Sequence, residues 1–360
     1  MKLHHFVPTW EAGAVGQHVV EMHAALRDTG IDGNVYAGVV RDGLPLRARP
    51  VEQYEHDAAP GDVLCYQHAI GSTVVDAVLE RREPLVVEYH NVTPHEFFDP
   101  WDRTVADALD WGRRQLRPLA RRSVLGLADS AYNEEEMRAV GFTTTAVVPV
   151  LVDARRGPTV VDDTRRDELR RTKRGTDVLF VGRLAPNKAQ HDLVKMFAVY
   201  RRAFDPAARL WLVGRDTVAR YRLALERFVD AIGLTGAVQI TGGVGDGALN
   251  AYYDVADAFV CMSRHEGFGV PLLEAMAHDI PVVARATTAV PETVSDAAVL
   301  LDEHAPVADY AAATWRAATD AGLREVLVQR GRRRLDAYAL PRLRAQLLDA
   351  LAPVLGVRAP

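Results

Sequence analysis

Short apolar runs alternate with amphipathic segments along the chain, and this alternation limits the possible folds more than any other feature. In the first half we expect strands near residues 3–7, 34–39, 62–67, 85–90, 126–128 and 146–152, and helices near 15–28, 72–82, 101–122 and 133–140. In the second half we expect strands near 178–181, 210–213, 238–241, 258–262, 281–284 and 299–301, and helices near 189–204, 217–232, 246–254, 270–278 and 307–335. Several strands are apolar at nearly every position, as in parallel sheets covered on both faces. The sequence therefore predicts two Rossmann-like α/β domains, each with a doubly wound parallel sheet.

A polar segment, residues 153–176, separates the two series. It contains a glycine, a proline and a basic run in which acidic residues are interspersed. Mixed charge in this position favours a solvated linker over a nucleic-acid patch. We therefore predict an N-terminal domain over 1–155, a linker over 156–176, a C-terminal domain over 177–338 and, within 339–360, a last helix that crosses back to the N-terminal domain. Ligands of such sheets bind outside the carboxyl ends of the strands, so we expect the site in a central cleft that the two domains face.

The charge balance of this 360-residue chain is mildly acidic, with 43 Lys and Arg against 48 Asp and Glu and a net charge of −5. A chain of this charge has no general attraction to nucleic acid, so phosphate recognition requires a few well-placed cations. The two cysteines, Cys65 and Cys261, are too few for a disulfide framework or a thiolate zinc site. The chain shows no signal-peptide pattern and no uncharged apolar run near the roughly 18 residues of a membrane span. We expect a cytoplasmic protein with no nucleic-acid partner.

Arginines recur at intervals of four within the helix expected over 101–122, at Arg113, Arg117 and Arg121. Residues four apart share one face of a helix, so these side chains are expected to form a basic stripe. A solvated face is the favoured interpretation. Peripheral contact with the inner face of a membrane is the alternative.

The segment around Glu266 is the most informative about function. A buried strand ends near Ser263, and a loop that carries Glu266 and Gly267 leads into a helix that starts near Gly269. The amides of Phe268, Gly269 and Val270 would point outward from the positive end of this helix, where anions and hydroxyl groups bind. The glycines allow a ligand to approach the backbone closely.

Two carboxylates belong to this segment: Glu266 lies in the loop, and Glu274 lies about one turn into the helix. Both are poor neighbours for a phosphate alone, but ionised carboxylates are strong acceptors for hydroxyl groups. Glu274 also stands among apolar residues, where a carboxylate without a function is costly. A ligand that combines phosphate with hydroxyl groups, such as a nucleotide sugar, accounts for both.

A second cluster follows the strand expected near 178–181. Gly182 makes a turn, Arg183 and Lys188 flank the residues before the next helix, and Asn187 is a candidate cap of that helix. Two cations at the carboxyl end of a strand can neutralise a diphosphate leaving group. No Asp-x-Asp triplet occurs in the sequence, and we expect no metal.

These residues resemble the retaining glycosyltransferases of the GT-B fold, specifically the large family 4. The spacing of Glu266 and Glu274 is similar to the family's Glu-x7-Glu signature, and Arg183 with Lys188 is similar to its phosphate-binding pair. The run that ends at Gly242 also looks familial, which implies a donor contact there. The resemblance covers nearly the whole C-terminal domain, and it is specific for the family but not for the substrate.

The first domain adds weaker signals, which the resemblance helps to interpret. Gly13, Ala14 and Gly16 follow the first strand, where the family usually has paired glycines near the donor diphosphate and the acceptor. Ala14 departs from that pattern. His90 ends a buried strand, and the resemblance implies a histidine there near the donor sugar. Asp129-Ser130 is interpreted as a helix cap, with acceptor contact as the alternative.

The expected activity is the transfer of a sugar from a nucleoside diphosphate sugar, UDP- or GDP-linked, to an unidentified hydroxyl acceptor. Arg183 and Lys188 would bind the diphosphate, Glu274 the ribose, and Glu266 the sugar, while the first domain presents the acceptor. The resemblance implies retention of configuration, and we expect neither a cofactor nor a metal. The alternatives are a related sugar-nucleotide epimerase or hydrolase and a non-catalytic sugar-nucleotide-binding protein.

Overall fold

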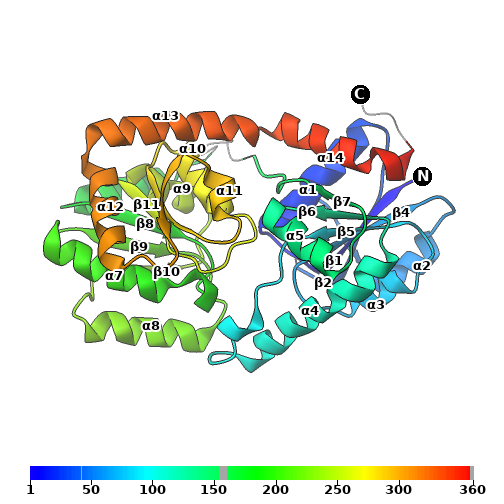
Figure 1. The fold of residues 1–360 in the computed structure, drawn as a ribbon, viewed down its shortest axis with the longest axis horizontal. Coiled ribbons are helices and arrows are strands. Elements are labelled where there is room, and N and C mark those ends of the chain that lie inside the picture. Colours follow the sequence, from blue (N-terminus) through cyan, green and yellow to red (C-terminus); the bar gives the residue numbers. More distant parts are fainter. Residues whose placement is uncertain (42, 154–159, 357–360) are drawn as a thin grey trace. The chain divides into compact units, whose positions relative to one another are not determined.

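The computed structural model describes residues 1–41, 43–153 and 160–356, which form two compact units (Figure 1). The first unit contains residues 1–96 and 103–153 together with the chain from Tyr338 onward. The second unit contains residues 97–102 and, among the described residues, 160–337. The expected domain boundary at 155/156 lies outside the described residues.

A seven-stranded sheet forms the centre of the first unit. Its strands are β1 (Leu3–Trp10), β2 (Val35–Val40), β3 (Ala48–Pro50), β4 (Val63–His68), β5 (Leu85–Tyr89), β6 (Leu125–Ala128) and β7 (Thr145–Val147). All pairs are parallel, and the spatial order is β3-β2-β1-β4-β5-β6-β7. The order reverses between β1 and β4, which makes the sheet doubly wound.

Helices cover both faces of this sheet (Figure 1). They are α1 (Ala14–Asp28), α2 (Tyr54–Asp57), α3 (Val74–Leu79), α4 (Arg103–Arg122), α5 (Ala131–Val140) and α14 (Leu340–Leu355). Glu88 of β5 contacts His18 of α1, whereas the next residue, Tyr89, donates a hydrogen bond to Glu136 of α5. Successive side chains of a strand point to opposite faces, so α1 and α5 lie on opposite faces of the sheet.

The last helix, α14, packs against α1 in the first unit. Leu343, Leu347 and Leu351 recur every four residues and are fully buried, which gives the helix one apolar face. Arg344 on its edge lies 2.7 Å from Glu21 of α1. The chain therefore completes its first unit with its last helix.

The second unit contains a six-stranded parallel sheet. Its strands are β8 (Asp177–Val181), β9 (Arg209–Val213), β10 (Val238–Gly242), β11 (Ala258–Cys261), β12 (Val282–Ala286) and β13 (Ala298–Asp302). The spatial order β10-β9-β8-β11-β12-β13 reverses between β8 and β11, so the ligand-binding position of this fold lies where these two strands end. The helices are α6 (Asp163–Thr172), α7 (Gln190–Ala203), α8 (Ala219–Ala231), α9 (Asp246–Val255), α10 (Val270–Ala277), α11 (Val290–Val294), α12 (Val307–Thr319) and α13 (Ala321–Ala337). The expected class, two doubly wound parallel sheets, is confirmed.

Three local predictions were wrong. The strand expected over 146–152 ends at Val147, because Pro149 has no N–H for the ladder. The single helix expected over 307–335 is two helices, which separate at Asp320, whose carboxylate accepts the Leu323 N–H. The segment expected to be a solvated linker contains α6, whose N-terminus is capped by the Asp162 side chain.

Candidate functional site

The loops after β8 and β11 are hydrogen-bonded to each other where the second sheet reverses its order. The Arg264 N–H donates to the Asn187 carbonyl at 2.8 Å, and the Asn187 side chain donates to the His265 carbonyl at 3.2 Å. The sequence indicated Asn187 as a candidate cap of α7, but this residue is buried and does not cap the helix. Ala189 is the residue that precedes α7. The two loops therefore form one connected structure.

Lys188 and Glu266 make an ion pair across these loops. The Lys188 Nζ lies 2.5 Å from Glu266 Oε2, and the two side chains are only 15% and 11% exposed. The Glu266 N–H donates to Thr288 Oγ1 at 2.9 Å, from the loop after β12. Thr288 has φ of 47°, a left-handed conformation that is unusual for a β-branched residue. Residues that follow β8 and β12 thus contact the carboxylate and the backbone N–H of Glu266, respectively.

The turn into α10 brings backbone amides next to Glu266. Gly269 precedes the helix with φ of 98°, which only glycine adopts without strain, and Pro271 lies in the first turn. Phe268 is buried, and its carbonyl accepts a hydrogen bond from Thr293 Oγ1 at 2.6 Å. Gly267 and Val270 are half-buried. The first amides of α10 are thus held on a fixed backbone.

Glu274 lies one turn into α10 and is held by Tyr253 of α9. The Tyr253 hydroxyl donates to Glu274 Oε2 at 2.7 Å, and the tyrosine ring stacks on His278 with centroids 4.9 Å apart. Burial raises the pKa of Glu274, against the opposing effect of the Tyr253 hydrogen bond. The carboxylate is thus partly desolvated and fixed in direction.

Glycines bring the ends of β8, β9 and β10 close together. A side chain on Gly214 would place its Cβ 2.1 Å from the Gly182 carbonyl oxygen, so no other residue is accommodated there. Gly242 at the end of β10 has φ of 73°. Arg183 follows Gly182 and is exposed at this edge of the sheet.

His90 of the first unit is held between two acceptors. Its Nδ1 lies 3.0 Å from Asp129 Oδ2, and its Nε2 lies 2.6 Å from Gln67 Oε1. Burial alone would lower the pKa of His90, but the charge of Asp129 and its hydrogen bond raise it. Ser130 caps α5 as expected, since its side chain accepts from the Asn133 N–H, whereas Asp129 binds His90 instead.

The glycine loop after β1 contains one residue, Gly16, with a local structural role in this unit. Gly13 precedes α1, and both Gly13 and Ala14 are exposed. A side chain on Gly16 would place its Cβ 2.3 Å from the Glu11 carbonyl oxygen, so Gly16 is required for close packing inside the unit.

His18, Glu88 and His90 are the described residues whose spacing suggests a metal site, since their ligand atoms lie within 4.8 Å of one another. The Leu151 N–H donates to His18 Nδ1 at 2.8 Å, so the ring proton of His18 is on Nε2, which faces Glu88 Oε1 at 2.7 Å. Both nitrogens of His90 also face acceptors. The His18 and His90 nitrogens that face these acceptors therefore carry protons, and the cluster does not fit a metal ion.

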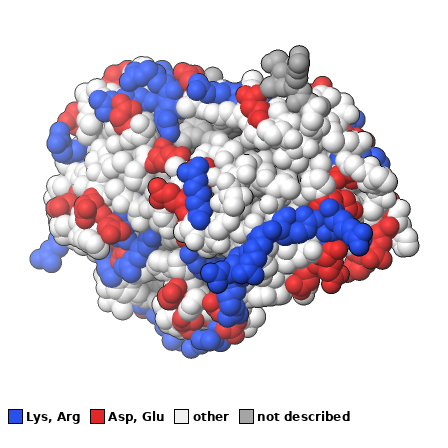
Figure 2. All heavy atoms as spheres, turned by 45° about the vertical axis from the view of Figure 1, so that its right-hand side comes forward, with Lys and Arg blue, Asp and Glu red and all other residues white. Residues whose placement is uncertain are grey.

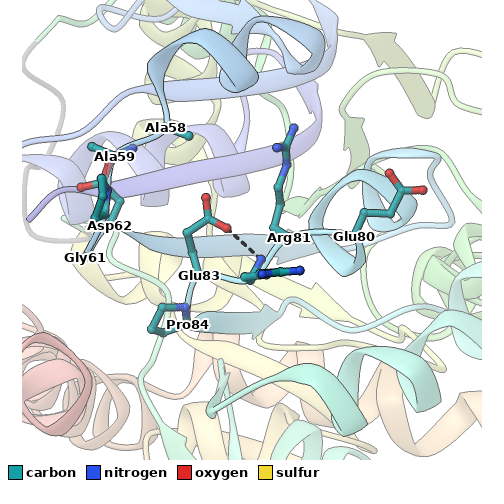
Figure 3. A pocket seen from close by; sticks show the side chains of 10 residues that line it. Ala58, Ala59, Gly61, Asp62, Glu80, Arg81, Glu83 and Pro84 are labelled. Atoms are coloured by element: carbon teal, nitrogen blue, oxygen red, sulfur yellow. Dashed lines mark hydrogen bonds between the residues drawn. The ribbon is translucent and has the colours of Figure 1, made fainter.

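A hollow of about 620 Å³ lies elsewhere, where the chain enters β4 and β5 (Figure 3). Its polar groups are bound locally. Glu83 accepts from the Tyr54 hydroxyl and the Arg82 N–H, and the Asp62 carboxylate accepts from the Lys2 and Ala59 N–H groups. This hollow is at the amino ends of the strands, away from the edge where such sheets bind ligands.

Sequence reasoning missed Thr288, Tyr253, Gln67 and Glu88. Glu88 carried a usable signal, because it is a carboxylate in an otherwise apolar strand. The other three gave none, since their partners are distant in the sequence.

Comparison with known proteins identifies the family. Residues 161–334 match the model described as glycosyl transferases group 1. The D-inositol 3-phosphate glycosyltransferase of Salinispora arenicola is 33% identical over 276 residues, which are 72% of this chain and 60% of that protein. The chain thus matches less than two thirds of that relative's length.

Solved structures share the fold. Sucrose-phosphate synthase from Thermosynechococcus elongatus has a TM-score of 0.79 at 19% identity and covers 99% of this chain and 100% of its own. Anabaena Alr3699/HepE, solved with UDP-glucose, has a TM-score of 0.79 at 17% identity, over 98% of this chain and 100% of its own. Residues 161–334 belong to the glycosyl transferases group 1 family and the chain has the GT-B fold, which confirms the resemblance seen in the sequence.

Proposed function

We propose that the protein is a glycosyltransferase that moves a sugar from a nucleoside diphosphate sugar to a hydroxyl acceptor, with retention of configuration. The observation that carries the proposal is the Lys188–Glu266 pair beside the start of α10, with Glu274 one turn further along. A cation, a helix N-terminus and two carboxylates match the phosphate and hydroxyl groups of one ligand.

In this proposal the second unit binds the donor. Arg183 and Lys188 contact the diphosphate and offset the charge that develops on the leaving group, which is the role we assign instead of a metal. Glu274 accepts from the ribose, because Tyr253 occupies only its Oε2. Glu266 and the amides from Phe268 to Val270 bind the sugar. Gly242 allows the nucleotide to lie close to the end of β10.

The first unit presents the acceptor, with His90 near the reacting carbon and Gly13 and Ala14 beside the phosphates. The name of the Salinispora relative gives an inositol phosphate as its substrate, and HepE was solved with UDP-glucose. These names support a polar acceptor and a UDP-linked donor, and a GDP-linked donor is the alternative that we propose from the sequence. No coenzyme enters the proposed reaction.

Peripheral contact with the inner face of a membrane remains part of the proposal. No helix among residues 1–41, 43–153 and 160–356 is long and apolar enough to cross a bilayer. Arg114, Arg117 and Arg121 are exposed on α4, whereas Arg113 turns inward to the Val92 carbonyl and Glu136. Figure 2 shows an elongated band of basic side chains on one face. Loss of binding to anionic vesicles in the triple alanine variant of these three arginines would support it.

The test is turnover of a panel of UDP-, GDP- and dTDP-sugars with and without inositol phosphates and simple sugars as acceptors. We expect nucleotide release that depends on the acceptor, together with a glycosylated product of retained configuration by NMR. Release without acceptor would identify a hydrolase. Binding without release would identify a non-catalytic protein, and either result would overturn the proposal.

A further inference from the structure

Five polar side chains lie together on the α1 side of the first unit's sheet. They are His18 of α1, Gln67 of β4, Glu88 of β5, His90 after β5 and Asp129 after β6. Gln67 and Glu88 are register partners on neighbouring parallel strands, so their side chains lie side by side. His18, Gln67 and Glu88 are fully buried, and the side chains of His90 and Asp129 are 4% and 3% exposed.

The hydrogen bonds of this cluster set the tautomer of His18 and the orientation of the Gln67 amide. Because the Leu151 N–H donates to His18 Nδ1, the His18 proton on Nε2 faces Glu88 Oε1. Gln67 Nε2 donates to the other oxygen, Glu88 Oε2, at 3.1 Å. The amide of Gln67 is thereby oriented, and its Oε1 faces His90 Nε2 at 2.6 Å.

An amide oxygen can only accept, so His90 Nε2 has to carry a proton. Nδ1 carries the other, because it faces the Asp129 carboxylate. With a neutral amide partner in place of the Glu88 carboxylate, the Gln67 side chain would be free to turn over and present its NH2 to His90. Glu88 therefore affects His90 without contacting it, because Glu88 fixes the orientation of the Gln67 amide.

We propose that Glu88, acting through Gln67, is a positioning residue that keeps His90 doubly protonated. In this state His90 donates hydrogen bonds and supplies a positive charge, and it does not accept a proton from the acceptor hydroxyl. This inference rests on the proposed function only for its catalytic consequence. The protonation state itself is a property of the folded first unit.

Few charged and titratable groups act on His90 among the described residues of the first unit. Asp129 follows β6, Glu88 is on β5, His18 is on α1 with its ring centroid 5.3 Å from that of His90, and His68 is on β4. The contact with His18, the charge of His90 and the Gln67 hydrogen bond outweigh burial and lower the pKa of Glu88 to about 2. Glu88 thus stays ionised across the working pH range.

The first experiment is long-range 1H–15N NMR of the histidine side chains in the full chain, with His90 assigned from the spectrum of His90→Asn. We expect both ring nitrogens of His90 to be protonated at pH 7.5. Glu88→Gln should lower its pKa by at least about one unit. The double variant Gln67→Glu with Glu88→Gln exchanges the two groups, and it should restore the imidazolium because a carboxylate then faces His90 Nε2 directly.

Tyr89→Phe is the matched control, since it alters the same strand on the opposite face and should leave His90 unchanged. A neutral His90 in the wild-type protein would overturn the proposal, even if no variant folds. An unchanged pKa of His90 in Glu88→Gln would also overturn it.

The second experiment measures acceptor-dependent nucleotide release against pH. Glu88→Gln should lower kcat at pH 8 by about tenfold and leave the donor KM unchanged, and the exchanged double variant should recover most of the loss. Equal kcat profiles for Glu88→Gln and the wild type would contradict the catalytic consequence. Absence of transfer with every donor would refute the proposed function, whereas the NMR result would stand.

Discussion

Lys188 Nζ and Glu266 Oε2 lie 2.5 Å apart, and this contact joins the loops after two adjacent strands of the second sheet. When no anion is bound, the charges of Lys188 and Glu266 neutralise each other. A diphosphate that contacts Lys188 would have to draw it partly away from Glu266, and the carboxylate would then be available to a sugar hydroxyl. In the proposed function, donor binding and the release of Glu266 would thus be linked through one ammonium group.

We expect Lys188→Ala and Arg183→Ala each to lower kcat/KM by at least about two orders of magnitude, which is comparable to the loss of one preorganised donor. Lys188→Ala also leaves Glu266 without its partner, so its effect should be the larger. Steady-state assays of nucleotide release provide the measurement, and Arg220→Ala on α8 is the control for the loss of an exposed charge. Near-normal activity in either site variant would contradict the assigned role.

Tyr253→Phe should weaken nucleotide binding about tenfold, because Glu274 loses the hydrogen bond that orients it. Burial already raises the pKa of Glu274, and without the tyrosine hydroxyl this pKa should rise further. Binding that depends on the ionised carboxylate is lost as pH falls through this pKa, so the loss should begin at a higher pH in the variant. Calorimetric titration with UDP and GDP at several pH values measures both effects, with Tyr252→Phe as the control.

Thr288→Val should lower kcat about tenfold with little change in the donor KM. The substitution keeps the shape of the side chain but removes the oxygen that accepts the Glu266 N–H. Thr288→Ser retains this oxygen and should behave like the wild type. If valine and serine have the same effect, the hydrogen bond does not position Glu266.

Two buried histidines should make the protein sensitive to acid. Burial lowers the pKa of His5 to about 3 and that of His68 to about 4. Between these values and pH 6.5 the unfolded chain binds more protons than the folded one, so the free energy of unfolding falls as pH decreases. Each group contributes a slope of about 1.4 kcal/mol per pH unit.

His5→Leu should remove the contribution of one titrating group from this slope. The substitution breaks no hydrogen bond of the side chain, because both ring nitrogens of His5 lack a hydrogen-bond partner. Urea unfolding followed by circular dichroism at pH 7 and pH 5 gives the comparison. A pH dependence equal to that of the wild type would show that His5 does not titrate in this way.

The fold could be predicted from the sequence because buried strands and helices each have a recognisable local pattern of apolar residues. The apolar strands and the helices between them are each visible within a few residues, and the Glu266 and Glu274 segment is continuous. The Lys188–Glu266 contact is different, since it depends on β8 and β11 being neighbours, which strand composition does not encode. Asn187 shows the same limit: its local context suggested a cap, and its partner came from a distant loop.

The buried network of the first unit was the least predictable part. His90 was identified by the family resemblance, but its protonation depends on the register of Gln67 against Glu88. A shift of one residue would send one of these side chains to the opposite face. No pattern within either strand specifies that pairing.

The position of α14 has a consequence for how the protein is made. The surface of α1 that meets this helix is synthesised before the second unit, and the helix that covers it is synthesised after the second unit. The first unit therefore stays unfinished on the ribosome while the whole second unit is produced. A fragment that ends at residue 153 would expose the apolar surface beneath Leu343, Leu347 and Leu351, and it should aggregate unless the last helix is supplied as a separate peptide.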